Sequence, residues 1–397
     1  MAQDNNHGTS EAAALYVGGT WLSRFSAGSG QRRARRWARI GRYWLENRVC
    51  KLTGEDGGFS QYSTNYHRLF LVTLVQAELW RRRLGDAPFT SSLVQRCKAA
   101  ADWLAAVTNA ESGNAPNLGA NDGADAFNLM LSDYRDYRPA AALATMVFGA
   151  GDRTEPTDEI SFADLPAQAK RSRTFPDFGL ALLNPRGDGG GAYAFLRFPV
   201  RRFRPSHADP LHFDLWTADG RNLLRDGGTF SYADPEWSAY FSGIAAHNTV
   251  QFGDREPMPR ISRFLFADWI QGSFETLPDA EGWSRWSGRY TDAFGAWHRR
   301  TVEAKDDSWR IVDEIGGTDL APTIRWRLLT DDWQSLPGGA RGQSLSVTVA
   351  GDTTPDEVLL VSGWESLRYL EKSACPVLKA RFPKGTRRIE TTIALRN

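Results

Sequence analysis

The order of apolar and polar residues changes its period near the middle of the chain. Between about residue 10 and residue 150, apolar side chains recur every three to four positions, which predicts amphipathic helices. The segments that follow this spacing most clearly are residues 30–52, 66–84, 91–107 and 139–148. Antiparallel helix pairs in series indicate part of an α/α toroid, and a plain helical bundle fits the same periodicity.

Beyond residue 172 the period becomes that of β-strands. Short apolar runs are separated by turn signals such as Asp-Gly at 219–220 and Gly-Gly at 338–339. The runs lie at residues 178–183, 192–198, 213–216, 249–252, 309–312 and 345–349. Many short strands in succession predict a large antiparallel β-sandwich.

A polar and irregular segment, residues 151–172, separates the two halves, and we interpret it as a linker. The predicted organisation is a helical domain, residues 1–150, then this linker, then a β-sandwich domain, residues 173–397. A chain of 397 residues is long enough for two hydrophobic cores. The fold class is therefore α+β multidomain, with a partial α/α toroid followed by an antiparallel sandwich.

Composition and charge narrow the classes of function. The formal net charge is +1, so the chain lacks the strongly basic balance of a nucleic-acid-binding protein. No apolar run is long enough to span a bilayer, and the first residues contain no apolar core of a signal peptide. The three cysteines, Cys50, Cys97 and Cys375, have neither metal-binding nor redox spacing. Most basic residues are arginine, which binds carboxylates and sulfates, although a GC-rich genome explains this equally well.

Two polar elements in the helical half contain candidate catalytic residues. Asn6 and His7 stand in an NNHG run before a helix, where they serve either as an ordinary cap or as groups that point out of the helix. Tyr66 begins a helix shortly after a glycine-rich turn. It is either a boundary aromatic or a phenol that accepts or donates a proton in a cleft. His67 is interpreted as an ordinary core or surface histidine.

The sandwich half holds the densest polar segment. His207 precedes a predicted strand, Asp226 ends the next, and His247 opens a third. Three such residues on neighbouring strands predict a His/Asp/His zinc site with an open fourth position. Asp226 followed by two glycines also fits a simple turn, and His247-Asn248 also fits a hydrogen-bonded loop end.

This segment resembles the C-terminal domain of the heparinase II/III-type polysaccharide lyases. The resemblance rests on His-Ala-Asp at 207–209, on the G…LL.D.G…Y run from Gly220 to Tyr232, and on Ala-His-Asn-Thr-Val at 246–250. The helical half also resembles this family, with matching elements in the same order along the chain. The matching elements are NNHG at 5–8, S-x-x-Y-H at 63–67, PNLGANDGA at 116–124 and DYRDYRP at 133–139.

The resemblance implies β-elimination on a uronic-acid-containing, anionic polysaccharide such as a glycosaminoglycan or alginate. Asn6 would bind the substrate carboxylate, with His7 beside it as neutraliser or base. Tyr66 would be the general acid, and for one epimer of the uronate it would be either the acid alone or the base as well. His207, Asp226 and His247 would hold a structural zinc ion. The family also implies a place in the cell envelope or periplasm, while the lack of a signal peptide leaves the cytoplasm open.

The chain departs from the family at two positions. Pro205 stands where many members have a catalytic histidine, so a neutralising or basic group is missing unless His212 or Arg204, both expected to bind substrate, takes its place. Gln61 stands where a glutamate often precedes the tyrosine element. Tyr240 is the further residue expected to contact substrate.

Two hypotheses follow from this pattern. The first is a polysaccharide lyase, which the joint presence of Asn6, His7 and Tyr66 favours. The second is a non-catalytic glycan-binding or scaffold protein that keeps the zinc-stapled sandwich and has lost turnover with Pro205. A family toroid is longer than 150 residues, so we expect this chain to lack an upstream helical segment.

Overall fold

The computed structural model describes residues 4–126, 128, 131–149, 169–200 and 202–396. The chain forms two compact units, one helical and one built from β-sheets. Most of the predicted linker, residues 151–168, lies outside the described residues. No helix in the described part of the chain is long and apolar enough to cross a membrane.

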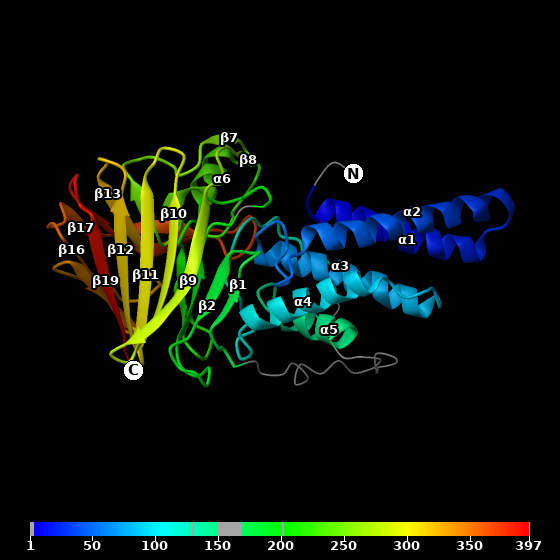
Figure 1. The fold of residues 1–397 in the computed structure, drawn as a ribbon, viewed down its shortest axis with the longest axis horizontal. Helices are drawn as coiled ribbons and strands as arrows, with labels where there is room; N and C mark the ends of the chain where they lie inside the picture. Colours follow the sequence, from blue (N-terminus) through cyan, green and yellow to red (C-terminus); the bar gives the residue numbers. More distant parts are fainter. Residues whose placement is uncertain (1–3, 127, 129–130, 150–168, 201, 397) are drawn as a thin grey trace. The chain divides into compact units, whose positions relative to one another are not determined.

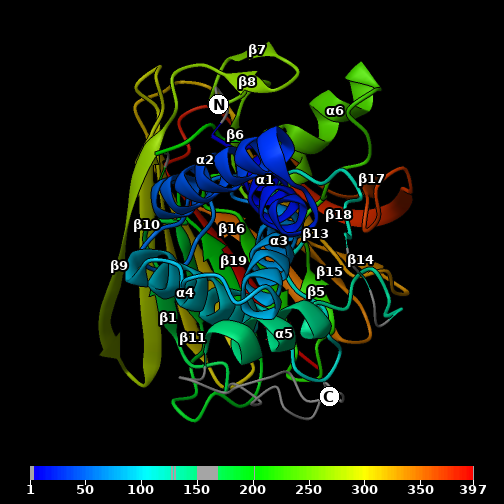
Figure 2. The same ribbon diagram turned by 90° about the vertical axis from the view of Figure 1, so that its right-hand side faces the viewer.

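The helical unit consists of antiparallel helices. Their bounds are α1 (Asn6–Phe25), α2 (Gly28–Leu52), α3 (Thr64–Arg83), α4 (Ser91–Val107) and α5 (Arg138–Phe148). Helices α1 and α2 lie side by side (Figure 2), with glycines where they cross. A Cβ atom on Gly41 would lie 2.3 Å from the backbone nitrogen of Tyr16, and one on Gly19 would lie 2.4 Å from that of Ala38. Glycine therefore permits a helix contact closer than side chains allow.

The first of these helices begins earlier than the apolar pattern indicates. Asn5 is its N-cap, and the Asn5 side chain accepts a hydrogen bond from the backbone N–H of His7 (3.1 Å). Asn6 and His7 therefore occupy the first turn of α1 and do not precede it.

The β unit contains two large sheets in the part of the chain that the structure describes (Figure 1). The five-stranded sheet has the order β1 (Arg173–Phe175), β2 (Leu180–Leu183), β3 (Tyr193–Arg197), β4 (Phe213–Trp216) and β5 (Asn222–Leu224). The eight-stranded sheet has the order β14 (Gln334–Leu336), β15 (Gly339–Arg341), β16 (Leu345–Gly351), β19 (Arg388–Leu395), β12 (Ser308–Gly316), β11 (Trp297–Lys305), β10 (Trp283–Thr291) and β9 (Gln271–Ala280).

Smaller elements complete this unit. A four-stranded sheet has the order β17 (Glu357–Glu365), β18 (Ser373–Arg381), β13 (Pro322–Arg327) and β6 (Val250–Phe252). A hairpin joins β7 (Arg260–Ser262) to β8 (Leu265–Phe266), and the helical turns α6 (Pro235–Ser242) and η2 (Ile244–Ala246) precede β6. The pattern of apolar residues did not predict α6.

The sheets share one apolar core. Phe213 on β4 packs against Trp309 on β12 and Trp326 on β13, with ring centroids 5.8 and 6.2 Å apart. Strands that pair within a sheet do so in antiparallel fashion, for example Leu196 opposite Phe213. The structure confirms the predicted fold class, helices followed by a large antiparallel β-sandwich.

One loop from the helical half packs on the sandwich. Residues 116–123, expected within the helical domain, belong to the β unit. The Asn117 side chain donates to the carbonyl of Ser366 (2.8 Å), and the Thr229 hydroxyl donates to the carbonyl of Gly119 (3.2 Å). The loop therefore lies beside the strand ends that carry the candidate metal ligands.

Candidate functional site

Asn6 and Tyr66 are joined through the segment that precedes α3. The backbone N–H of Asn6 donates to Oε1 of Gln61 (2.7 Å). The hydroxyl of Ser63 caps α3 and accepts from the backbone N–H of Tyr66 (3.1 Å). The N-terminal ends of α1 and α3 are thus held together, with Asn6 and Tyr66 buried and His7 exposed. Gln61 fills a structural role at the position where the family often has glutamate.

An arginine that the sequence analysis did not single out organises the start of α3. The Arg68 guanidinium donates to the side chain of Asn65 (2.8 Å) and to the carbonyl of Tyr134 (2.6 Å). It also lies over the rings of Tyr134 and Tyr137, at 4.7 and 4.6 Å from their centroids. The tyrosines of the DYRDYRP run therefore hold the helix that begins with the Tyr66 turn, a relationship that residue spacing alone does not reveal.

The predicted zinc ligands gather in one buried cluster. One potential ligand atom from each of His207, Asp226 and His247 lies within 4.8 Å of the others. His207 precedes β4, Asp226 follows β5, and His247 follows η2, so three separate loop ends supply the group. All three side chains are buried.

Hydrogen bonds in the cluster determine which ring nitrogens remain available. The Thr229 hydroxyl donates to Gly119, so it accepts from Nε2 of His207, which lies 3.1 Å away. Nδ1 of His247 lies 2.9 Å from a carboxylate oxygen of Asp226. These contacts leave Nδ1 of His207 and Nε2 of His247 buried and without a hydrogen-bond partner among the described residues. A carboxylate or hydroxyl partner on one nitrogen, with the other left free, is the usual arrangement of a metal-binding histidine.

The charges of the cluster also suit a metal. Burial lowers the pKa of His207 to about 4, so that ring is neutral and offers a lone pair. Burial opposes the charge on Asp226, but the neighbouring His247 and His212 outweigh it and hold the pKa of the carboxyl below its usual range. Two imidazoles and one ionised carboxylate are a donor set that divalent zinc prefers. The group can therefore hold a metal ion.

A second layer of contacts holds these loop ends. Asn248 donates its side-chain N–H to the carbonyl of Phe213 (2.8 Å) and accepts the backbone N–H of Arg327 through Oδ1 (2.6 Å). Its backbone N–H donates to Nδ1 of His212 (2.9 Å). Nε2 of His212 then points toward Asp226, 3.5 Å from its carboxylate. Asn248 thus connects the strands that flank the cluster.

Arg300, on β11 of the eight-stranded sheet, contacts the backbone of residues next to the cluster. Its guanidinium forms a two-point ion pair with Asp313 (2.7 and 3.0 Å) and donates to the carbonyls of Leu211 (2.7 Å) and Asn248 (2.6 Å). Leu211 has φ +55°, a conformation that costs energy in a residue with a branched side chain. The hydrogen bond from Arg300 helps to hold that conformation next to His212.

The remaining predicted residues occupy different surroundings. His212, expected to bind substrate, is only 1 % exposed, and this burial favours a role beside Asp226 over direct substrate contact. Pro205 is buried, whereas Arg204 is exposed and its guanidinium lies 6.0 Å from the ring centre of Phe264. The half-buried Tyr240 accepts from the backbone N–H of Trp364 (3.1 Å) through its hydroxyl.

Comparisons with solved structures identify the fold. A heparinase III structure matches 99% of this chain with a TM-score of 0.75 and 16% identity, and a second heparinase III structure matches all of it with a TM-score of 0.76. The heparan sulfate lyase HepC from Pedobacter heparinus matches all of the chain with a TM-score of 0.68 and 16% identity. The chain spans 60% to 62% of the length of these structures.

The sequence comparisons give the family. No curated protein matches the chain significantly. The family described as "Heparinase II/III-like, C-terminal" matches residues 167–389, which include the whole candidate metal cluster. Since this match covers more than half of the chain, the protein belongs to the heparinase II/III-like family.

Proposed function

We propose that the protein is a polysaccharide lyase that cleaves a uronic-acid-containing polysaccharide by β-elimination. The observation that supports this proposal most is the hydrogen bond between Asn6 and Gln61 (2.7 Å), which holds the Asn-His element against the segment that carries Tyr66. The structures that share this fold include a heparinase III and a heparan sulfate lyase, and both names refer to an anionic glycosaminoglycan as substrate. This chain is accordingly assigned a glycosaminoglycan or an alginate-like polymer as substrate.

The reaction sets three requirements for the side chains. The proton on C5 of the uronate becomes acidic only when the neighbouring carboxylate is neutralised, and Asn6 is assigned to that carboxylate. His7 lies beside Asn6 as a further neutraliser or as the base that removes the C5 proton. Tyr66 donates a proton to the 4-O leaving oxygen, so the bond to the leaving sugar breaks and a double bond forms at the new end.

We further propose that His207, Asp226 and His247 hold a structural zinc ion. The support is the pair of buried ring nitrogens without partners and the neutral form of His207. Zinc, when bound, would tie three loop ends of the sandwich together. His212 and Asn248 then act on the cluster by orienting Asp226 and His247, not by contacting the substrate.

One observation favours a second function, a glycan-binding or scaffold protein without turnover. Pro205 is buried at the position where many family members have a histidine, and a proline ring neither donates nor accepts a proton. Of the side chains expected to replace that histidine, His212 is buried and Arg204 is exposed.

The two functions are separated by incubation with alginate, heparan sulfate, hyaluronan and bacterial capsule polysaccharides. The ultraviolet absorbance of the unsaturated product end reports β-elimination directly. A signal from any of these polymers that disappears in Tyr66→Phe supports the lyase. Binding of a polymer without any such signal would instead support the scaffold function.

A further inference from the structure

Helix α2 carries a local excess of positive charge, although the formal net charge of the whole chain is +1. No acidic residue occurs between Glu11 and Glu46, whereas seven arginines do. Five of these arginines are exposed in the first half of α2, namely Arg32, Arg33, Arg35, Arg36 and Arg39. The first half of this helix is therefore strongly basic.

The five arginines have no acidic neighbour that balances them. Within the described part of the chain, the ion pairs of α2 all lie after residue 41. The sequence spacing also places Arg32 beside Arg36 and Arg35 beside Arg39, four positions apart on the helix. Like charges at this spacing destabilise a helix. The hairpin thus carries repulsion that its own residues do not offset.

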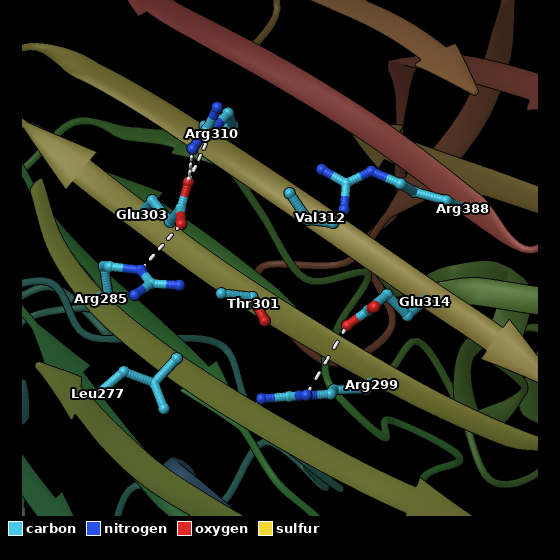
Figure 3. A pocket seen from close by; sticks show the side chains of 9 residues that line it. All are labelled: Leu277, Arg285, Arg299, Thr301, Glu303, Arg310, Val312, Glu314 and Arg388. Atoms are coloured by element: carbon cyan, nitrogen blue, oxygen red, sulfur yellow. Dashed lines mark hydrogen bonds and ion pairs between the residues drawn. The ribbon is translucent and has the colours of Figure 1, made fainter. Parts of the chain in front are cut away.

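Arginines elsewhere on the surface are balanced. On the eight-stranded sheet, Figure 3 shows Glu303 between Arg285 and Arg310, and Nε of Arg285 lies 3.0 Å from the Glu303 carboxylate. Arg299 on the same face is paired with two further glutamates. That face is an ordinary ion-pair lattice, which needs no ligand to explain it. Helix α2 differs because its exposed half has no carboxylates.

Large apolar side chains are exposed at the same end of the hairpin. Trp21 and Phe25, in the last turns of α1, are 44% and 72% exposed, and their ring centroids lie 4.9 Å apart. The Gln31 side chain donates to the carbonyl of Ser23 (3.0 Å), so the end of α1 is held beside the start of α2. The exposed rings and the arginines therefore share one hairpin tip, residues 21–39.

The hairpin tip is convex. Figure 1 shows the turn that joins α1 to α2 at the free end of the hairpin. A Cβ atom at Gly18 or Gly28 would meet no heavy atom within 4 Å, so no neighbouring side chain stands beside these positions as the wall of a groove. A polymer chain is usually bound in a concave site. Exposed tryptophan and phenylalanine beside arginines on a protruding element suit a flat boundary between polar and apolar phases.

A solvated helix face is the ordinary explanation for a run of charges, and single exposed aromatic residues are normal. It accounts for arginines mixed with glutamates. It does not account for a segment, residues 12–45, that lacks every acidic residue and also exposes Trp21 and Phe25 together. The two features coincide at the hairpin tip, and this coincidence favours a binding surface.

We propose that the hairpin tip binds a membrane surface that contains anionic lipids. The arginines would contact lipid phosphate groups, and Trp21 and Phe25 would enter the boundary between headgroups and acyl chains. Such binding is peripheral, since no helix in the described part of the chain is apolar enough to cross a bilayer. The proposal is independent of the lyase activity.

The test measures co-sedimentation of the full chain with lipid vesicles. We expect binding to vesicles of phosphatidylglycerol and phosphatidylcholine in equal parts, weaker binding at high salt, and little binding to phosphatidylcholine alone. Dextran sulfate is the competing polyanion in solution. Binding of dextran sulfate without binding to the anionic vesicles would assign the arginines to a soluble polymer and overturn the proposal. Equal binding to both kinds of vesicle would also overturn it.

The charge is tested by replacing three arginines on α2 and three elsewhere. The test variant is R32Q/R33Q/R36Q, and the control is R221Q/R381Q/R388Q, whose arginines are exposed in the β unit. Both variants lose the same formal charge. We expect the test variant to raise the Kd for anionic vesicles about fivefold per arginine, on the order of a hundredfold in all, and the control to change it by less than about threefold. Equal effects of the two variants would contradict a specific role of the tip.

Insertion of the aromatic side chains is tested separately by Phe25→Ser. Its control is Phe294→Ser, because Phe294 is also exposed, by 53%, but lies in the β unit. We expect Phe25→Ser to raise the Kd about tenfold, since burial of a phenylalanine side chain is lost, and Phe294→Ser to leave it unchanged. Circular dichroism verifies that both variants keep the native helix content. Equal Kd values for the two variants would exclude insertion of the tip.

Discussion

Asn248 donates its backbone N–H to Nδ1 of His212 over 2.9 Å, and this contact assigns the proton of the neutral His212 ring to Nε2. Burial lowers the pKa of His212 to about 3, so the ring is neutral near pH 7. The protonated Nε2 points at the carboxylate of Asp226, 3.5 Å away. A residue predicted to touch substrate is thus placed to orient a candidate metal ligand.

Replacing His212 tests that role. His212→Phe removes the donor beside Asp226, and we expect zinc affinity to fall about tenfold to a hundredfold, as is usual when an outer-layer partner of a metal ligand is lost. His212→Gln keeps an N–H donor and should recover part of the affinity. The measurement is competition with a chromogenic chelator. The control is His67→Phe, a buried histidine of the helical unit, which should leave zinc affinity unchanged. Unchanged affinity in His212→Phe would contradict the assignment.

Thr229 is expected to set the proton position of His207. Thr229→Val keeps the shape but removes the hydroxyl that accepts from Nε2 of His207 (3.1 Å). The ring then loses its preference for leaving Nδ1 free, so zinc affinity should fall about tenfold. Thr391→Val is the matched control, because Thr391 is also buried and hydrogen-bonded, to Trp326 (3.1 Å), but lies on β19, away from the loop that carries Thr229. Equal affinities in the two variants would exclude a role for Thr229.

Removal of the metal should destabilise the sandwich. Treatment with a strong chelator is expected to lower the melting temperature, and added zinc should restore it, because the proposed ion would tie three loop ends together. His207→Ala should contain less than one zinc per chain and should no longer respond to the chelator. The checks are metal analysis by mass spectrometry and thermal unfolding. A full complement of zinc in His207→Ala would refute the proposed ligand set.

Tyr66→Phe should abolish the production of unsaturated ends while the fold stays intact. The substitution removes only the hydroxyl that is proposed to protonate the leaving oxygen. Tyr16→Phe is the control within the same unit, since the Tyr16 hydroxyl is bonded to Asp86 (2.7 Å) and has no assigned catalytic role. That control should lose some stability and keep its activity. Full activity in Tyr66→Phe would exclude this residue as the acid.

The helical unit should lose stability in acid through His67. Burial lowers the pKa of His67 to about 4, below the ordinary 6.5, despite a backbone contact with Ala100 (2.9 Å). The unfolded chain therefore binds a proton that the folded chain excludes between these pH values. The free energy of unfolding should fall by about 2 kcal/mol between pH 7 and pH 5 from this residue. Urea unfolding of the native protein and His67→Phe measures the difference, and an equal pH dependence of both would contradict it.

The sequence predicted much of the fold because local patterns decide it. The three-to-four-residue spacing of apolar side chains predicted the extents of α3 and α4 closely, and the short apolar runs between turn signals marked strands such as β4. It did not predict α6, whose eight residues are too few to show a helical period. The polar start of α1 hid the fact that Asn6 lies inside the helix.

The candidate site shows which features could not be predicted from the local sequence pattern. Residue types at strand ends and a family resemblance were enough to nominate His207, Asp226 and His247. Only the tertiary structure decided that His212 lies beside Asp226 and that Glu303 stands opposite Arg285, since both depend on which strands pair and in what register. Helix and strand periods are short-range properties of the chain. Contacts between residues far apart in sequence are fixed by packing of whole sheets, which no local window contains.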